Sequence, residues 1–309
     1  MKHYILGTDE AGYGPNLGPL VIGCTVWEME VYDFLQTTYV NDHLVELERR
    51  LAPITADSPT QLGKNDKAWI IGDSKKLYQK GKLHVLANSV LTALHLTGQL
   101  FSELQTYNLQ TYNLEGIKAF ADHVLKSLLQ LRVSLCAVNV EMISPRDFNH
   151  LLGHLGNKST LLSEATLSLI KNAIQALPDG GDVTVLCDKH GGRNYYADLL
   201  YKFFPDPGWI EILKEGTSQS VYRLGFQNRT IEFRFQTKAD RHIPAALASM
   251  TAKLLRELAM LEFNRFWQQY LPDLRPTAGY PVDALRFFGQ IEEISQKLGF
   301  PKNDIWREK

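Results

Sequence analysis

The sequence predicts an α/β fold, and three observations lead to that prediction. Short apolar runs rich in β-branched residues alternate with longer amphipathic stretches along most of the chain. The run at 183–187 is continuously apolar, which is typical of a central strand buried on both faces. No stretch rich in proline, glycine and serine divides the chain, so we expect one main domain.

The individual elements follow from periodicity and from breaker residues. Apolar and β-branched runs predict strands, in chain order, at 3–8, 18–27, 133–142, 183–187, 209–214 and 230–236. Amphipathic patterns predict helices at 31–51, 82–98, 115–131, 159–177, 193–204 and 243–268. Ser144 and Pro145 are typical of a helix start, as the cap and the first helical residue. We expect a surface loop at 53–66, and an exposed loop or hairpin at the short local duplication 106–114.

Composition disfavours several classes of protein. The 309 residues include 33 Lys and Arg against 34 Asp and Glu, a formal net charge of −1, so no overall basic field points to a protein that coats nucleic acid. A local basic cleft is still compatible with that balance. The cysteines, Cys24, Cys136 and Cys187, are widely spaced and odd in number, as expected for reduced thiols rather than a disulfide frame. No apolar run is long enough to span a bilayer, so we expect a cytoplasmic enzyme.

Carboxylates recur where predicted strands end. Asp9 and Glu10 end the first strand, Asp188 ends the buried strand, and Asp240 follows the strand at 230–236. Active sites of α/β proteins usually lie at strand ends, and Mg²⁺ or Mn²⁺ requires several converging oxygen ligands. Because a cluster of acids repels itself without metal, these residues predict a divalent-metal site. The alternative is that each acid is a helix cap or a solvated turn residue.

Five segments of the chain, in order, resemble the type 2 ribonuclease H family, which comprises ribonucleases HII and HIII. They are Gly7-Thr8-Asp9-Glu10-Ala11-Gly12-Tyr13-Gly14-Pro15, Gly72-Asp73-Ser74-Lys75-Lys76-Leu77, Ser144-Pro145 with Glu164-Ala165-Thr166, the alanine-rich stretch 245–253, and Gly279-Tyr280-Pro281. The resemblance implies a ribonuclease H-like fold with a mixed central sheet flanked by helices. It predicts a catalytic domain over 1–260 with an insertion at about 193–236, followed by a helical C-terminal appendage over 261–309.

The resemblance also implies roles for single residues. Asp9 and Glu10 match the first two metal ligands of the family, and Asp188 matches the third. Asp240 matches the fourth ligand, although it lies one residue closer to Ser249 than the family pattern has it.

Substrate contacts carry over in the same way. The backbone of Gly12 and Gly14 would read the ribose 2′-hydroxyl, and Tyr280 would stack on a sugar. Ser74 and Lys75 match a phosphate-contacting segment. Lys76 belongs to the same lysine-rich run at 64–82, which either binds the nucleic-acid backbone or forms a solvated helix face.

Two departures from the family pattern bear on the substrate. Tyr13 stands where the family has Arg or Lys; it either stacks on a base or sugar, or is a half-buried turn residue. After Asp188 the chain continues Lys189-His190-Gly191-Gly192-Arg193 instead of a lone glycine. His190 could shuttle a proton or stabilise the leaving oxygen, and Lys189 or Arg193 could bind phosphate. The alternative is a surface loop of solvated charges.

Together these observations predict a metal-dependent endonuclease that uses Mg²⁺ or Mn²⁺. Its expected substrate is the RNA strand of an RNA–DNA hybrid, or ribonucleotides embedded in duplex DNA, with 5′-phosphate and 3′-hydroxyl products. One alternative keeps the nuclease chemistry but takes a structured DNA substrate. Another is a non-catalytic nucleic-acid-binding protein, which four retained carboxylates disfavour. No membrane and no obligate protein partner is expected.

Overall fold

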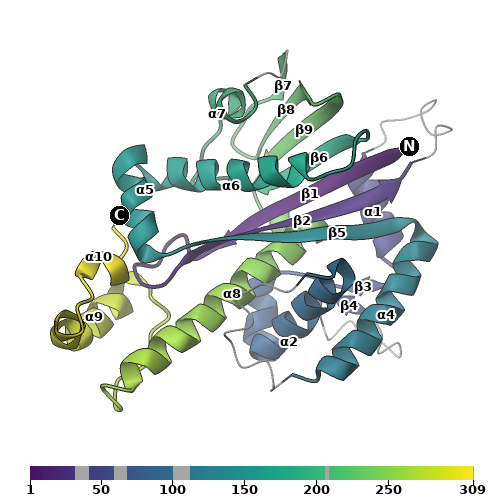
Figure 1. Ribbon diagram of the computed structural model, residues 1–309. Helices are drawn as coiled ribbons and strands as arrows, with labels where there is room; N and C mark the ends of the chain where they lie inside the picture. The colour runs from purple at the N-terminus through teal and green to yellow at the C-terminus, as the bar shows by residue number, and fades with distance from the viewer. Residues whose placement is uncertain (32–41, 59–67, 100–111, 206–208, 309) are drawn as a thin grey trace.

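The computed structural model describes residues 1–31, 42–58, 68–99, 112–205 and 209–308. Its centre is a seven-stranded sheet in the order β5-β2-β1-β6-β9-β8-β7 (Figure 1). The strands are β1 (Lys2–Ala11), β2 (Leu20–Glu30), β5 (Val133–Ile143), β6 (Asp182–Asp188), β7 (Ile210–Lys214), β8 (Gln219–Phe226) and β9 (Arg229–Gln236). Strands β1, β6 and β9 are parallel, whereas β2, β5, β8 and β7 join by antiparallel pairing. The expected mixed sheet is therefore confirmed.

Helices cover both faces of the sheet, as expected. On one face lie α1 (His43–Leu51), α2 (Ser74–Thr97), α4 (Leu114–Leu131) and α8 (Ile243–Gln268), and on the other lie α5 (Pro145–Leu155), α6 (Lys158–Gln175) and α7 (Ala197–Phe203) (Figure 1). The short strands β3 (Thr55–Ala56) and β4 (Trp69–Ile70) pair with each other beside α2. None of the helices in the described ranges is long and apolar enough to cross a membrane.

Helix α8 lies unusually close to the sheet, and two glycines make this possible. A Cβ at Gly7 would lie 2.2 Å from the carbonyl carbon of Pro244, and a Cβ at Gly23 would lie 2.4 Å from the carbonyl oxygen of Ala248. Only glycine tolerates such an approach of two backbones. The start of α8 is thereby fixed against β1, and it follows directly on the 3₁₀ turn η4 (Ala239–Arg241) that carries Asp240.

Most predicted elements appear with small shifts, and α8 has the predicted bounds. Of the helix expected at 31–51, the last nine residues form α1, and 32–41 lie outside the described residues. Helix α2 begins at Ser74 rather than at 82, since the Asp73 side chain accepts hydrogen bonds from the Lys75 and Lys76 amides and caps it. Of the duplication at 106–114, only its last three residues are described, and there Asn113 caps α4.

One expected boundary falls inside a helix of the structure, and the expected insertion includes a strand of the core sheet. The expected insertion at 193–236 ends with β9, a core strand parallel to β6, and it also contains β8, which was not predicted. The expected appendage at 261–309 begins within α8, which continues unbroken through residue 260. After α8 come α9 (Pro281–Lys297) and α10 (Lys302–Ile305), which share a small core with Leu17, Trp267 and Phe287.

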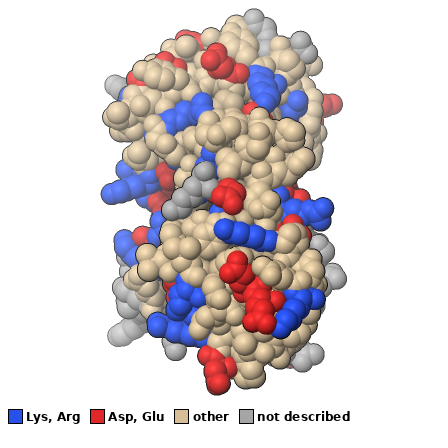
Figure 2. All heavy atoms as spheres, turned by 90° about the vertical axis from the view of Figure 1, so that its left-hand side faces the viewer, with Lys and Arg blue, Asp and Glu red and all other residues tan. Residues whose placement is uncertain are grey.

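Charged side chains are dispersed over the face that carries α9 and α10. Figure 2 shows this face with Lys and Arg interspersed among Asp and Glu and no continuous field of one sign. This distribution agrees with the net charge of −1. Any basic contact to a polyanion on this protein therefore has to be local.

Candidate active site

The predicted carboxylates meet where the parallel strands end. Because Thr8 and Cys187 are the last pair of the β1–β6 ladder, Asp9 and Asp188 lie at the same level just beyond it, where β6 ends and β1 continues to Ala11. Asp188 accepts a 3.3 Å hydrogen bond from the Ala239 amide, which ties it to the turn that carries Asp240. Asp9, Glu10, Asp188 and Asp240 all line one pocket of about 450 Å³.

The acids of this pocket are electrostatically strained. Burial raises the pKa of Asp9 to about 7, and the charges of Asp188 and Asp240 act in the same direction. Burial also raises the pKa of Glu10 to about 8, with Asp9 and Asp188 adding to the shift and Lys75 opposing it. The pKa of Asp188 is raised by burial and by Asp240 as well. Perturbed carboxylates that face one another in a cleft are typical of functional sites.

Two serines hold Asp9 in place. The Asp9 carboxylate accepts a hydrogen bond from Ser249 on α8, which partly offsets the rise of its pKa. The Ser249 hydroxyl lies 3.0 Å from that of Ser74, the first residue of α2. Ser74 lines the pocket, but it is 4% exposed and its hydroxyl is engaged with Ser249. The structure therefore places Ser74 behind the acids, as a support of Asp9.

The donor chemistry of the pocket suits a hard divalent cation. Four carboxylates supply oxygen ligands of the kind that Mg²⁺ and Mn²⁺ prefer. The raised pKa values of Asp9, Glu10 and Asp188 indicate that a positive charge would stabilise their ionised forms. Within the described ranges, however, no three His, Cys, Asp or Glu side chains are already arranged closely enough to hold a metal ion. The acids converge on one pocket as expected, without forming a closed ligand cluster.

The glycine loop forms one wall of the pocket. Gly12 has φ of +90°, and a Cβ there would lie 2.5 Å from Arg256 Nε and 2.6 Å from the Pro19 carbonyl oxygen. Gly14 has open space around it and its φ is not positive, so nothing among the described residues requires glycine there. Tyr13 is half-buried and packs against the core on the α6 face of the sheet. Burial and the charge of Glu10 raise the pKa of Tyr13.

The predicted basic and aromatic contacts divide into two groups. Lys75 lines the pocket and lies near Glu10, and Tyr280 lines it with a 56% exposed side chain at the start of α9. Lys76 does not line the pocket; its ammonium lies 3.4 Å from Asp73 and is otherwise exposed. Of the two lysines, only Lys75 lines the pocket, and the phosphate contacts of both stay predictions.

The loop after Asp188 differs from the expectation. His190 is 2% exposed, its Nδ1 lies 3.1 Å from the Ser163 hydroxyl, and its ring packs edge-on against Tyr196 and Phe235. Burial lowers the pKa of His190 to about 3. A neutral histidine in the core does not shuttle protons for the pocket, so the structure speaks against that role.

The basic residues of this loop also point away from the pocket. Arg193 donates to the Thr160 hydroxyl at 3.2 Å, and Lys189 donates to the carbonyl oxygens of Arg193 and Gly216 and to Asn194 Oδ1. Neither lines the pocket. Lys189 instead fastens the inserted segment to the end of β6.

Sequence reasoning missed Arg256. This residue lines the pocket from α8, is 2% exposed, and has an Nε that lacks a hydrogen-bond partner in the structure as described. Its Nη2 donates to the Ala278 carbonyl at 2.8 Å. The sequence could have indicated Arg256 by its position one helical turn after Lys253. Lys253 also lines the pocket and ends the alanine-rich segment.

Similar proteins were found by comparison of structures and not by comparison of sequences. No protein-family model matches the chain, and no curated protein matches its sequence. The fold is similar to that of the ribonuclease H2 from Pyrococcus horikoshii OT3, with 17% identity, a TM-score of 0.47, and coverage of 99% of this chain and 92% of that one. It is also similar to a structure of the PCNA:RNase HII complex from Archaeoglobus fulgidus, with 14% identity, a TM-score of 0.43 and coverage of 99% and 94%.

A further similar structure is Aquifex aeolicus RNase H3, at 13% identity and a TM-score of 0.37, covering 98% of this chain and 70% of that one. All three carry the names of type 2 ribonucleases H. The chemistry assigned below rests on the pocket itself.

Proposed function

We propose that this protein is a metal-dependent ribonuclease H of type 2. It would cut the RNA strand of an RNA–DNA hybrid, or a ribonucleotide embedded in duplex DNA, leaving 5′-phosphate and 3′-hydroxyl ends. One observation carries the proposal. Asp9, Glu10 and Asp188 have raised pKa values and line, with Asp240, one pocket whose wall is the Gly12–Gly14 loop. The free cysteine thiols of the protein favour a cytoplasmic location.

The four carboxylates would hold Mg²⁺ or Mn²⁺, which supplies Lewis acidity for in-line attack of water on phosphorus. The remaining roles belong to the chain. Lys75 would bind a phosphate beside Glu10, and Tyr280 would stack on a sugar at the exposed rim. The Ser74–Ser249 pair would keep Asp9 oriented. Selection of ribose would fall to the backbone of Gly12 and Gly14, since a 2′-hydroxyl distinguishes RNA from DNA.

The test compares three duplexes with Mg²⁺ or Mn²⁺: an RNA–DNA hybrid, a DNA duplex with one ribonucleotide, and its all-deoxy twin. We expect cleavage of the first two and none of the third. Equal cleavage of the last two would overturn ribose selection and leave the structured-DNA nuclease as the better description. No cleavage of any duplex would favour the binding protein.

Variants of the glycine loop sharpen this test. Gly14→Ala meets no atom of the protein, so it should leave stability unchanged and reduce cleavage at the ribonucleotide, by roughly ten- to a hundredfold if one hydrogen bond is lost. Gly153→Ala on α5 is the matched control, because Gly153 also has open space around it but lines no part of the pocket. Equal cleavage by the two variants would contradict the role of the loop.

A further inference from the structure

The glycine loop is paired with a segment almost 300 residues away in sequence. Leu17 forms an antiparallel bridge with Trp306. Next to it, the Arg307 amide donates to the Asn16 carbonyl at 2.7 Å, and Asn16 Nδ2 donates to the Arg307 carbonyl at 2.9 Å. We call residues 303–308 the latch segment. Its backbone lies directly against the far end of the loop that begins at Gly12.

One side chain of the latch segment reaches the loop. Arg307 is 0% exposed, and its Nη2 donates to the carbonyl of Gly12 at 2.5 Å and to the carbonyl of Pro15. Its guanidinium carbon lies 4.8 Å from the centre of the Phe148 ring. Because one nitrogen binds the carbonyls on both sides of Tyr13 and Gly14, Arg307 fixes the distance between the two ends of that turn. Arg307 Nε and Nη1 have no hydrogen-bond partner in the structure as described, so distorting the turn would remove the side-chain hydrogen bonds of a buried cation, which is costly.

The same loop is also held to the residue that precedes Tyr280. The Gly279 carbonyl accepts hydrogen bonds from the amides of Asn16 at 2.8 Å and Leu17 at 3.2 Å. The glycine loop and Tyr280, which form the two walls of the pocket that would contact the sugar, are therefore held in a fixed position relative to each other.

The latch segment is fastened from outside by a residue remote from the pocket. Asn149 on α5 donates from Nδ2 to the carbonyls of Asn303 at 3.0 Å and Trp306 at 2.7 Å. Its Oδ1 accepts a 2.8 Å hydrogen bond from the Glu308 amide. Asn149 touches neither the glycine loop nor the pocket acids in these contacts, so it offers a way to loosen the latch segment alone.

We propose that Arg307 is a positioning residue that sets the shape of the Gly12–Gly14 loop and thereby the selectivity of the pocket for ribose. The proposal rests on the proposed function for its substrate. It deepens that function by assigning selectivity to a segment outside the pocket. The residue acts through the loop backbone and does not itself touch substrate.

The experiment uses the full chain with Arg307→Ala, Arg307→Lys, Asn149→Ala and Arg229→Ala. Arg229 is the matched control, because it is 6% exposed and donates from Nη2 to the Pro178 carbonyl at 2.8 Å, at the opposite end of the sheet. One readout is amide hydrogen exchange of residues 12–17, which reports local opening whether or not the protein cleaves anything. The other is kcat and KM on the duplex with a single ribonucleotide.

We expect Arg307→Ala to speed exchange at 12–17 and to raise KM about tenfold, with a smaller change in kcat. Arg307→Lys should restore part of the loss, and Asn149→Ala should act in the same direction more weakly. Should Arg307→Ala fold poorly, Asn149→Ala carries the same test. Exchange and KM indistinguishable from those of Arg229→Ala would overturn the proposal. An inactive wild-type chain with normal loop exchange would instead refute the proposed function.

Discussion

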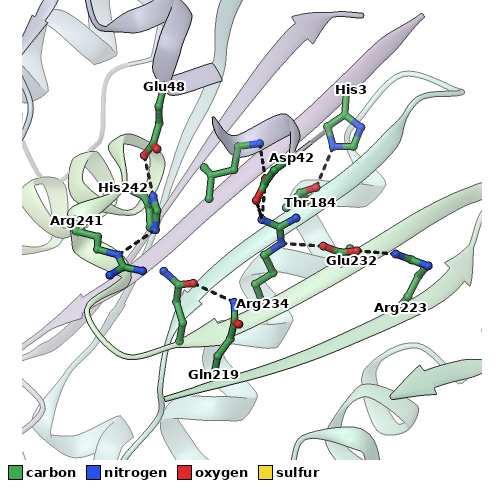
Figure 3. Close-up of polar contacts among 12 residues, drawn as sticks. His3, Asp42, Glu48, Thr184, Gln219, Arg223, Glu232, Arg234, Arg241 and His242 are labelled. Atoms are coloured by element: carbon green, nitrogen blue, oxygen red, sulfur yellow. Dashed lines mark hydrogen bonds and ion pairs between the residues drawn. The ribbon is translucent and has the colours of Figure 1, made fainter. Parts of the chain in front are cut away.

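Charged side chains near the start of strand β1 are paired with opposite charges, whereas those at its other end lie among like charges. At its start, His3 Nε2 lies 2.9 Å from the Thr184 hydroxyl, and Arg234 binds both oxygens of Asp42 at 2.8 and 2.7 Å (Figure 3). Arg234 also binds Glu232, which in turn binds Arg223, so each charge of this network has an opposite partner. At the other end, Asp9 and Glu10 face further acids and have raised pKa values.

This difference indicates that the first group of charges stabilises the fold and that the second serves a function. A closed network of opposite charges holds α1 against β9 and contributes to folding. A group of acids that repel one another lowers stability and persists where a ligand compensates for it. Figure 3 also shows that Glu48 on α1 bonds to His242, next to the turn that carries Asp240, at 2.8 Å.

The largest expected effect comes from Asp9→Asn. It should reduce cleavage by on the order of a thousandfold, because it removes a charge that the proposed metal site requires. Asp182→Asn, at the opposite end of β6, is the control and should cleave normally.

The same variant should stabilise the metal-free protein. Since the pKa of Asp9 is about 7 when folded and 3.8 ordinarily, its contribution to stability is present at low pH and is lost as the pH rises through 7. Urea unfolding in chelator should therefore show a gain of about 1–3 kcal/mol at pH 8 and little gain at pH 4. Equal gains at both pH values would contradict this assignment.

Arg234→Ala should do the reverse at the other end of the strand. It leaves Asp42 and Glu232 without their cation, so we expect a loss of about 2–4 kcal/mol in the free energy of unfolding. Cleavage by the fraction that is folded should be unchanged. Lys297→Ala, which breaks an exposed helical pair with Glu293, is the control and should cost about 0.5 kcal/mol or less. A large loss of specific activity in Arg234→Ala would mean that the two ends are coupled.

A further effect on stability is expected on the acid side of the stability curve. Burial lowers the pKa of His3 from 6.5 to about 3, so its neutral form is retained in the folded protein. Its contribution to stability is present above pH 6.5 and is lost as the pH falls towards 3, by up to about 1.4 kcal/mol per pH unit. His3→Gln should therefore flatten the dependence of unfolding free energy on pH between 6.5 and 4. An unchanged slope would show that His3 titrates normally.

The smallest expected effect distinguishes the two lysines that begin α2. Lys75→Ala should weaken binding of every duplex and reduce the slope of log K against log salt by about one, as the loss of one phosphate contact predicts. Lys76→Ala should change the slope less, because Lys76 lies outside the pocket beside Asp73. Slopes that are unchanged from the wild type in both variants would return both residues to a solvated helix face.

Local pattern was sufficient for much of the fold. The acids could be predicted at strand ends because apolar periodicity stops abruptly at Asp9 and Asp188. The start of α5 was confirmed at Ser144 and Pro145, since a capping hydroxyl and a fixed proline φ act within one turn. The strand β8 was missed, although its residues alternate between buried and part-exposed. Polar residues and Gly225 interrupt its apolar run, and Gln227-Asn228 follow it.

Tertiary packing decided which of the candidate residues reach the pocket. His190 has the chemistry of a proton shuttle, yet Tyr196 and Phe235 enclose its ring, and no local signal marks that burial. Lys75 and Lys76 are neighbours in the sequence, but the helical turn directs only one of them to the acids. Arg307 meets the Gly12 carbonyl across 295 positions of sequence. Strand ends follow from neighbours along the chain, whereas such contacts depend on how distant elements pack, which periodicity does not encode.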